Sequence, residues 1–388
     1  MENIYLILVV ILFALAISDL IVGVSNDAVN FLNSAIGSKV APFRIIMIVA
    51  ALGILAGALT SNGMMEVARK GIFHPQHFYF SEIMMIFLAV MITDILLLDM
   101  FNTFGLPTST TVSIVFELLG AAVAVSVVKI AGNPNALGLD EYINTGKAMA
   151  IIGGILLSVG VAFTVGALIQ YIARIVFTFN YKPKIKYFGA IWGGIAITAI
   201  TYFILIKGAK GATFMSDEVK EIIKTNTLLI IGISFITWTI ILQLLTMLFK
   251  LNILKAVVLV GTFALAMAFA GNDLVNFIGV PLAGYESFKA FIANPGADPN
   301  TFSMASLAGK VNTDAYLLII AGLIMVATLW LSKKAKSVVK TSLDLSKQTE
   351  GNERFGSSLF ARTLVRGSRN MGKGIGAIVP KKNKRRNK

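Results

Sequence analysis

The chain has 388 residues, of which 56 % are hydrophobic and only 14 % charged, and its mean hydropathy is +0.80. Soluble domains carry about 25 % charged residues, so this composition excludes an ordinary soluble enzyme and a disordered chain. It predicts an all-α polytopic protein of the cell (inner) membrane. The absence of cysteine excludes disulfides, zinc–thiolate centres and a cysteine nucleophile.

The net charge of +14 is concentrated at one end, because residues 333–388 hold 16 of the 34 Lys and Arg residues. A basic segment that follows a membrane span is typical of a cytoplasmic tail near anionic lipid headgroups. We therefore expect a transmembrane domain over residues 1–332 and a basic cytoplasmic tail over residues 333–388. The expected partner of the tail is the lipid bilayer and not nucleic acid.

Nine apolar segments are long enough to cross a hydrocarbon core, which needs about 20 residues. They lie at residues 4–24, 45–63, 82–100, 107–130, 148–174, 188–207, 225–249, 253–283 and 314–332. The first has no basic residues before it and leads into further spans, so we interpret it as a span and not a cleaved signal peptide. Segment 107–130 is equally compatible with a re-entrant segment. We expect residues 285–313 to form an external loop.

Lysines and arginines in short loops predict the orientation. If the chain crosses the membrane nine times, three basic stretches lie on the same side: residues 174–186, 250–255 and 333–336. This places the N-terminus outside and the C-terminal tail inside. Arg69 and Lys70 lie on the outer side and depart from the rule.

An internal repeat provides the strongest functional signal. Residues 24–31 and 270–277 share the pattern Asn-Asp-x-Val-Asn-Phe at an offset of 246. With the predicted orientation, the two copies run in opposite directions through the membrane. This is typical of inverted-repeat transporters, which bind substrate and coupling ions near the midplane at interrupted helices. We expect a first repeat over about residues 1–130 and the start of a second over about residues 250–332.

Each copy of the repeat places a carboxylate and an amide on one helix face, Asp27 with Asn30 and Asp273 with Asn276. Carboxylate and amide oxygens are suitable ligands for Na⁺, and the amide N–H₂ group can donate to an anion. The alternative is that each motif only caps a frayed helix end. Duplication in two opposed helices favours a binding site.

A second polar element is the segment from Gly105 to Thr111, in which Pro107 precedes four consecutive hydroxyl residues. Hydroxyls and free N–H groups at a helix N-terminus can bind an anion, although such side chains often bond back to their own helix. The spans also contain Asp19, Asp94 and Glu117, with Asp99 and Asn102 nearby. For these we leave open an ion site or hydrogen bonding inside the bundle.

Two histidines, His74 and His77, are close in sequence. We predict a solvated loop there and not a metal site, because no third ligand is apparent.

The chain resembles the inorganic phosphate transporter family, the sodium- or proton-coupled phosphate permeases, over about residues 1–332. The resemblance rests on residues 25–30, 271–276 and 107–111. It implies an inverted-repeat fold with re-entrant hairpins and the symport of phosphate with Na⁺ or H⁺, without another cofactor. It assigns substrate contacts to Asp27, Asn30, Ser109, Thr110, Thr111, Asp273 and Asn276, and cation contacts to Asn26, Asp27, Asn272 and Asp273, where Na⁺ would bind.

One feature of the family is missing. A second Pro-x-Ser-x-Thr hairpin should follow the second Asn-Asp helix, but Pro281 is followed by Leu-Ala-Gly and no such motif comes after Asn276. The chain is then a shortened form or fragment of a longer transporter, or another chain, such as a second copy in a homodimer, completes it. A third interpretation is a binding protein that does not transport.

The sequence thus favours a secondary transporter that imports inorganic phosphate with Na⁺ or H⁺. Close alternatives are a permease for sulfate or another tetrahedral oxyanion, and a membrane scaffold that binds without transport. An enzyme is disfavoured, because we find no phosphate-binding loop, nucleophile–base pair or metal triad.

Overall fold

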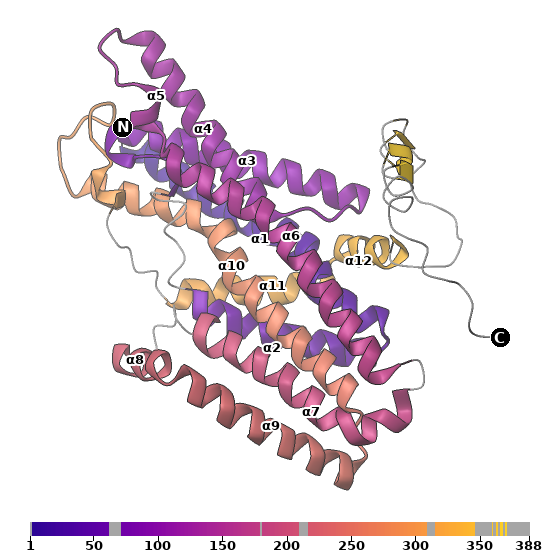
Figure 1. Ribbon diagram of the computed structural model, residues 1–388. Helices are drawn as coiled ribbons and strands as arrows, with labels where there is room; N and C mark the ends of the chain where they lie inside the picture. The colour runs from indigo at the N-terminus through magenta and orange to yellow at the C-terminus, as the bar shows by residue number, and fades with distance from the viewer. Residues whose placement is uncertain are drawn as a thin grey trace. The chain divides into compact units, whose positions relative to one another are not determined.

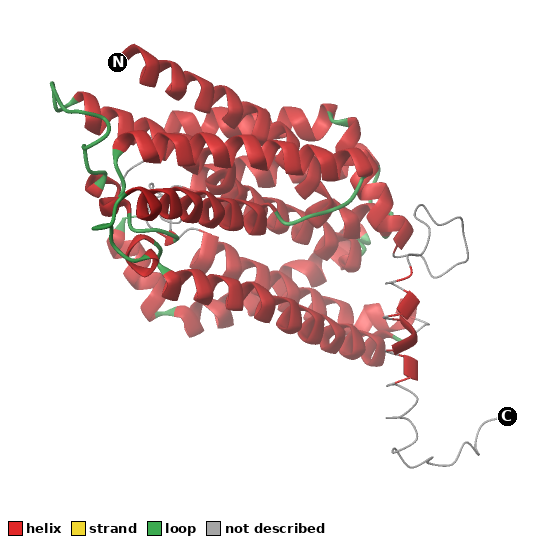
Figure 2. Ribbon diagram, turned by 90° about the horizontal axis from the view of Figure 1, so that it is seen from above, coloured by secondary structure: helices red, strands yellow, loops and turns green. Residues whose placement is uncertain are grey.

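The structure is a computed structural model that describes residues 2–61, 71–178, 181–208, 216–308 and 315–345, together with a few residues between 359 and 370. The chain divides into two units, residues 1–344 and residues 345–388. In the second unit the described residues are helical. The regular structure of the described residues is helical throughout (Figure 2), and extended pairing is limited to two isolated bridges.

The described residues of the first unit form twelve α-helices (Figure 1). They are α1 (Glu2–Gly37), α2 (Phe43–Thr60), α3 (Phe80–Phe104), α4 (Thr110–Gly132), α5 (Leu139–Tyr142), α6 (Thr145–Phe177), α7 (Tyr181–Tyr202), α8 (Asp217–Thr225), α9 (Thr227–Phe249), α10 (Ile253–Ile292), α11 (Ala315–Leu331) and α12 (Lys333–Leu345). Short 3₁₀ turns cover Pro75–His77 and Ala305–Ala308, and a π-helical turn, Phe203–Gly208, continues α7.

Eight of these helices are long and apolar enough to cross a membrane, and α11 with α12 forms a ninth candidate that bends by 66°. Each predicted apolar segment corresponds to one of them. The predicted external loop is wrong over residues 285–292, because α10 continues to Ile292. Arg69 and Lys70, the two exceptions to the charge rule, lie outside the described residues.

The two helices that carry the repeated motif, α1 and α10, pack against each other in opposite directions. Aromatic rings mark the pairing along their length: Tyr5 with Phe291 at 5.9 Å, Phe13 with Tyr285 at 5.8 Å, and Phe31 with Phe269 at 6.4 Å between centroids. As the residue number rises along α1, it falls along α10. The predicted antiparallel relation of the two motifs is therefore confirmed.

Small residues allow α2 to lie against α10. A Cβ atom at Gly53 would meet the carbonyl oxygen of Phe263, and one at Gly57 would meet that of Met267. Glycines one turn apart let two helix backbones approach closely. The packing of α2 on α10 fixes the part of α10 that leads into its Asn-Asp motif.

Helices α3 and α4 form an antiparallel hairpin. At its open end Lys129 of α4 pairs with Glu82 of α3 at 2.8 Å. At its closed end α3 stops at Gly105, which adopts φ 67°, a left-handed conformation that glycine tolerates without steric strain. The hairpin turns back beside Asn26, eleven residues before α1 ends. Its tip (residues 105–109) therefore lies against α1 at the first motif and not beyond the end of that helix.

Helices α6 and α9 have almost no buried surface: only 6 % of the most apolar window of each is buried. The apolar side chains of α6 are exposed almost throughout, which suits a helix surrounded by lipid. Helix α9 packs one side against α7 through Trp238 and Leu242, and its other side is exposed. The residues with the chemistry of interest lie elsewhere, where α1, α10 and the α3–α4 hairpin meet.

Candidate functional site

The hairpin tip is held by the first motif. Asn26 is fully buried, and its Nδ2 donates to Asn102 Oδ1 at 2.9 Å and to the carbonyl oxygen of Leu106 at 3.0 Å. Its Oδ1 accepts the backbone N–H of Thr108 at 2.7 Å. Asn102 in turn donates to the carbonyl oxygen of Val22 at 2.7 Å. The amide of Asn26 therefore connects α1, the end of α3 and the tip.

The first turn of α4 joins the two motifs. Thr110 Oγ1 donates to Asp27 Oδ2 at 3.1 Å and lies 3.5 Å from Asn276 Nδ2. Thr111 Oγ1 accepts from Asn276 Nδ2 at 3.0 Å and from Asn272 Nδ2 at 2.9 Å. Residues from three separate parts of the sequence are thus brought together, as the sequence predicts.

Asp27 and Asp273 are 3 % and 2 % exposed, and their carboxyl groups lie within hydrogen-bonding reach of each other. Asn30 Nδ2 approaches Asp27 Oδ1 at a long 3.4 Å, and the side chains of Asn30 and Asn272 are exposed. Two adjacent buried carboxylates repel each other strongly unless a cation or a proton lies between them. The pair can therefore hold a small cation.

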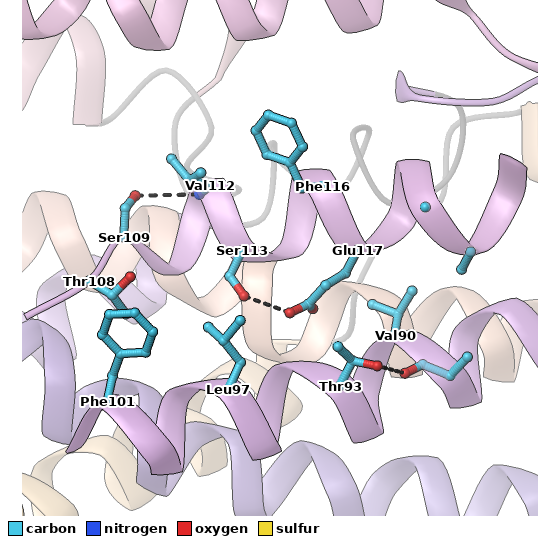
Figure 3. Close-up of a pocket in the computed structure, with 13 residues that line it drawn as sticks. Val90, Thr93, Leu97, Phe101, Thr108, Ser109, Val112, Ser113, Phe116 and Glu117 are labelled. Atoms are coloured by element: carbon cyan, nitrogen blue, oxygen red, sulfur yellow. Dashed lines mark hydrogen bonds between the residues drawn. The ribbon is translucent and has the colours of Figure 1, made fainter. Parts of the chain in front are cut away.

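Ser109 differs from its threonine neighbours. It caps α4, and its Oγ accepts the N–H of Val112 at 3.3 Å. It lines a cavity of about 600 Å³ between α3 and α4, together with Thr108, Ser113 and Glu117 (Figure 3). The bond of a hydroxyl to its own helix, the alternative weighed for this run, is thus observed at Ser109.

The acidic residues within the spans fall into two groups. Asp99 is 46 % exposed and pairs with Lys334 of α12, whereas Asp19 and Asp94 are fully buried. His74 precedes the 3₁₀ turn and His77 is its last residue, and their rings lie 6.3 Å apart. The described residues contain no group of three or more His, Cys, Asp or Glu side chains arranged to bind a metal ion.

Sequence reasoning missed the contacts that Ser332 and α12 make with the first motif helix. Ser25 Oγ lies 2.7 Å from Ser332 Oγ, and Asn33 Nδ2 donates to Ser342 Oγ at 3.0 Å. The start of the segment predicted as a tail therefore packs along α1 in the first unit. The helical spacing of Ala335, Val338 and Val339, all buried, was the available signal.

Comparison with known proteins gives a consistent result. Residues 23–342 match the family model described as "Phosphate transporter family". The chain is 23 % identical over 308 residues to "Putative phosphate permease PF1020" of Pyrococcus furiosus, and the match covers 77 % of this chain and 67 % of that protein. It is 24 % identical over 279 residues to "Putative phosphate permease TK2061" of Thermococcus kodakarensis, with 67 % of this chain and 62 % of that protein covered.

Among solved structures, the fold is similar to one titled "The sodium-dependent phosphate transporter". The TM-score is 0.59 at 18 % sequence identity, and the match covers 86 % of this chain and 78 % of the other. At this identity the similarity concerns the fold. The expected all-α fold of a polytopic transporter is confirmed.

Proposed function

This chain belongs to the phosphate transporter family, and from that premise we propose that it imports inorganic phosphate as a secondary transporter coupled to Na⁺ or H⁺. The observation that carries the proposal is the position of Thr110, which contacts Asp27 of the first motif and Asn276 of the second. The N-terminus of α4 therefore contacts both halves of the predicted site. In this proposal the hydroxyl and amide groups bind an anion, and the neighbouring carboxylates bind a cation.

The anion would bind at the start of α4. The first N–H groups of a helix have no partner within it, and the helix dipole is positive at that end. Thr110 and Thr111 add hydroxyls, and Asn272 and Asn276 add amide N–H groups directed at Thr111. Hydroxyl, amide and backbone donors can together bind a tetrahedral oxyanion.

The cation would bind between Asp27 and Asp273. Phosphate carries one to two negative charges near neutral pH, so its approach to this buried carboxylate pair is unfavourable until a cation or proton offsets the repulsion. Phosphate and cation should therefore bind cooperatively. This electrostatic requirement gives a physical reason for coupling the two fluxes.

The test is uptake of radiolabelled phosphate by proteoliposomes that contain this chain, under an inward Na⁺ gradient, an inward H⁺ gradient or neither. We expect accumulation with a gradient and a loss of cation dependence in Asp27→Asn. The matched control is Asp99→Asn, which removes a carboxylate from an exposed ion pair outside the site. Unchanged coupling in Asp27→Asn would contradict the assignment of the cation to this pair.

Two other outcomes would replace the proposal. Unlabelled sulfate that competes as well as phosphate would indicate a general oxyanion permease of this fold. Saturable phosphate binding without accumulation, by folded protein, would indicate a binding protein or a transporter that needs a second hairpin from elsewhere.

A further inference from the structure

Three carboxyl groups from three helices meet beside Ser113, one turn along α4 from Thr110. Asp19 of α1 and Asp94 of α3 are fully buried, and Glu117 of α4 completes the group. Ser113 Oγ lies 2.5 Å from Asp94 Oδ1 and 2.7 Å from Glu117 Oε1. We call Asp19, Asp94 and Glu117 the carboxyl triad. It is separate from the Asn-Asp motifs.

The hydrogen bonds of Ser113 require a proton on the triad. A serine hydroxyl carries one hydrogen, so it can donate to only one of its two carboxyl neighbours. The second short contact must then be made by a carboxylic acid that donates to Ser113 Oγ. If both acids were ionised, two oxygens would face each other without a hydrogen between them. At least one proton therefore resides on Asp94 or Glu117.

Asp19 extends the same argument. Neither of its carboxyl oxygens meets a donor among the described residues, and the same holds for Asp94 Oδ2 and Glu117 Oε2. The carboxyl groups of Asp19 and Asp94 lie within hydrogen-bonding reach of each other, and such a bond also needs a proton. A buried carboxylate without donors is costly, whereas the neutral acid is tolerated.

No cation from the described residues faces the triad. The charged groups that interact with Asp19 are Asp94, Glu117 and Asp27. The lysines on or against α3 and α4 are engaged elsewhere: Lys129 pairs with Glu82 and Lys334 with Asp99. With acidic neighbours alone, protonation is the available way to reduce the mutual repulsion.

The cavity between α3 and α4 provides access. Glu117 and Ser113 line it together with Ser109 of the hairpin tip, and Figure 3 shows the side chain of Glu117 meeting that of Ser113. Glu117 is thus the member through which water could deliver or remove a proton. Asp19 and Asp94 lie behind it, away from solvent.

We propose that the carboxyl triad is a proton-binding site that exchanges H⁺ with water through Glu117. This site is distinct from the pair formed by Asp27 and Asp273. In the exchange a carboxylate and a proton from water form a carboxylic acid, and release is the reverse. Because Asp27 interacts with both Asp19 and Asp94, a proton on the triad makes the phosphate site less negative and favours anion binding. This last step rests on the proposed function, whereas proton binding itself does not.

The test is infrared difference spectroscopy of the purified full chain in lipid, without phosphate, as the pH is changed. We expect carbonyl bands of protonated carboxylic acids that are lost or shifted in Asp19→Asn, Asp94→Asn and Glu117→Gln. The matched controls Asp99→Asn and Glu82→Gln, whose parent residues pair with lysines, should keep them. Bands that persist in the triple triad variant would overturn the proposal. Removal of the triad bands by Na⁺ at constant pH would also overturn it, in favour of a sodium site.

If a triad variant does not fold, Ser113→Ala takes its place, because it keeps all three acids and removes the hydroxyl that contacts Asp94 and Glu117. A shift of the bands in this variant supports the proposal, and an unchanged spectrum contradicts it. Phosphate uptake by the same preparations separates the two proposals. If the triad bands are present but the wild-type protein takes up no phosphate, only the proposed function is wrong. If the wild-type protein takes up phosphate but shows no triad bands, only the proton site is wrong.

Discussion

The side-chain oxygen of Asn26 accepts the backbone N–H of Thr108 at 2.7 Å, although 82 positions separate the two residues. The same amide donates to Asn102 and to the carbonyl oxygen of Leu106. A single buried side chain thus binds the hairpin tip to the first motif helix. The first Asn of the motif has a positioning role beside whatever ligand contact it makes.

Replacement of this residue should therefore cost stability. Asn26→Ala leaves a backbone N–H, a carbonyl oxygen and the amide of Asn102 without their partner in a buried place. Each unsatisfied group costs about 1–3 kcal/mol, so we expect a loss of about 2–4 kcal/mol after partial relaxation. Thermal unfolding in detergent measures it. Asn30→Ala is the matched control, because Asn30 is exposed and its one bond is long. Equal effects of the two substitutions would contradict this role.

Thr110 should matter to anion binding more than to folding. Thr110→Val keeps the side-chain shape and removes the donor to Asp27 and the contact with Asn276. We expect phosphate affinity to fall by about tenfold or more, the effect of about 1.4 kcal/mol, because a hydroxyl ligand is lost and Asp27 loses a donor. Equilibrium binding of labelled phosphate measures the change. Thr93→Val is the control, since the bond of Thr93 among the described residues is to Ala89 of its own helix. Wild-type affinity in Thr110→Val would remove Thr110 from the site.

The sequence predicted much of this site because its signals are local or repeated. The offset of 246 between the motifs and the apolar spacing of the spans predicted that α1 and α10 oppose each other, as the contact between Phe31 and Phe269 now shows. The sequence did not distinguish Ser109 from Thr110. Both are hydroxyl residues at a helix start, and only the packing of the tip places one on the cavity and the other on Asp27.

Other features depend on contacts that no local pattern encodes. Inverted-repeat transporters typically bind their substrates at interrupted helices, but here α1 and α10 continue through both motifs, and breaks lie at residues 105–109 and at Ser332. Continuity is tolerated because Thr110 satisfies Asp27 from another helix. The convergence of Asp19, Asp94 and Glu117 was equally hidden, since three separate helices must pack before their acids meet.

The buried carboxylate pair makes a prediction about ion-dependent stability. Asp27→Asn and Asp273→Asn each remove one of two repelling groups, so either variant should melt at a higher temperature than the wild type in a medium without sodium or phosphate. Added Na⁺ should raise the melting temperature of the wild type more than that of the variants, because a ligand of the native state stabilises it. Potassium at the same ionic strength is the control. Equal responses to both salts would show that sodium does not bind at this pair.

The ion pair between Asp99 and Lys334 should contribute little. Both side chains are 46 % exposed, and exposed pairs contribute about 0–1 kcal/mol. Asp99→Asn should therefore change the unfolding free energy by less than about 1 kcal/mol, and this small change should shrink at high salt. Chemical denaturation at two salt concentrations measures it. A larger loss would show that α12 depends on this contact more than on its packing along α1.

The close contact of α2 with α10 provides a test of the scaffold beneath the second motif. In Gly57→Ala the new methyl group meets the carbonyl oxygen of Met267, a backbone atom that cannot move without the helix. We expect a loss of about 1–3 kcal/mol from overpacking. Phosphate uptake should also decline, because the displaced turn of α10 leads directly into Asn272. Gly154→Ala is the matched control: nothing lies within 4 Å of its new methyl group, and alanine favours a helix by up to about 1 kcal/mol. If the two substitutions have equal effects on melting and uptake, the helices do not meet at Gly57.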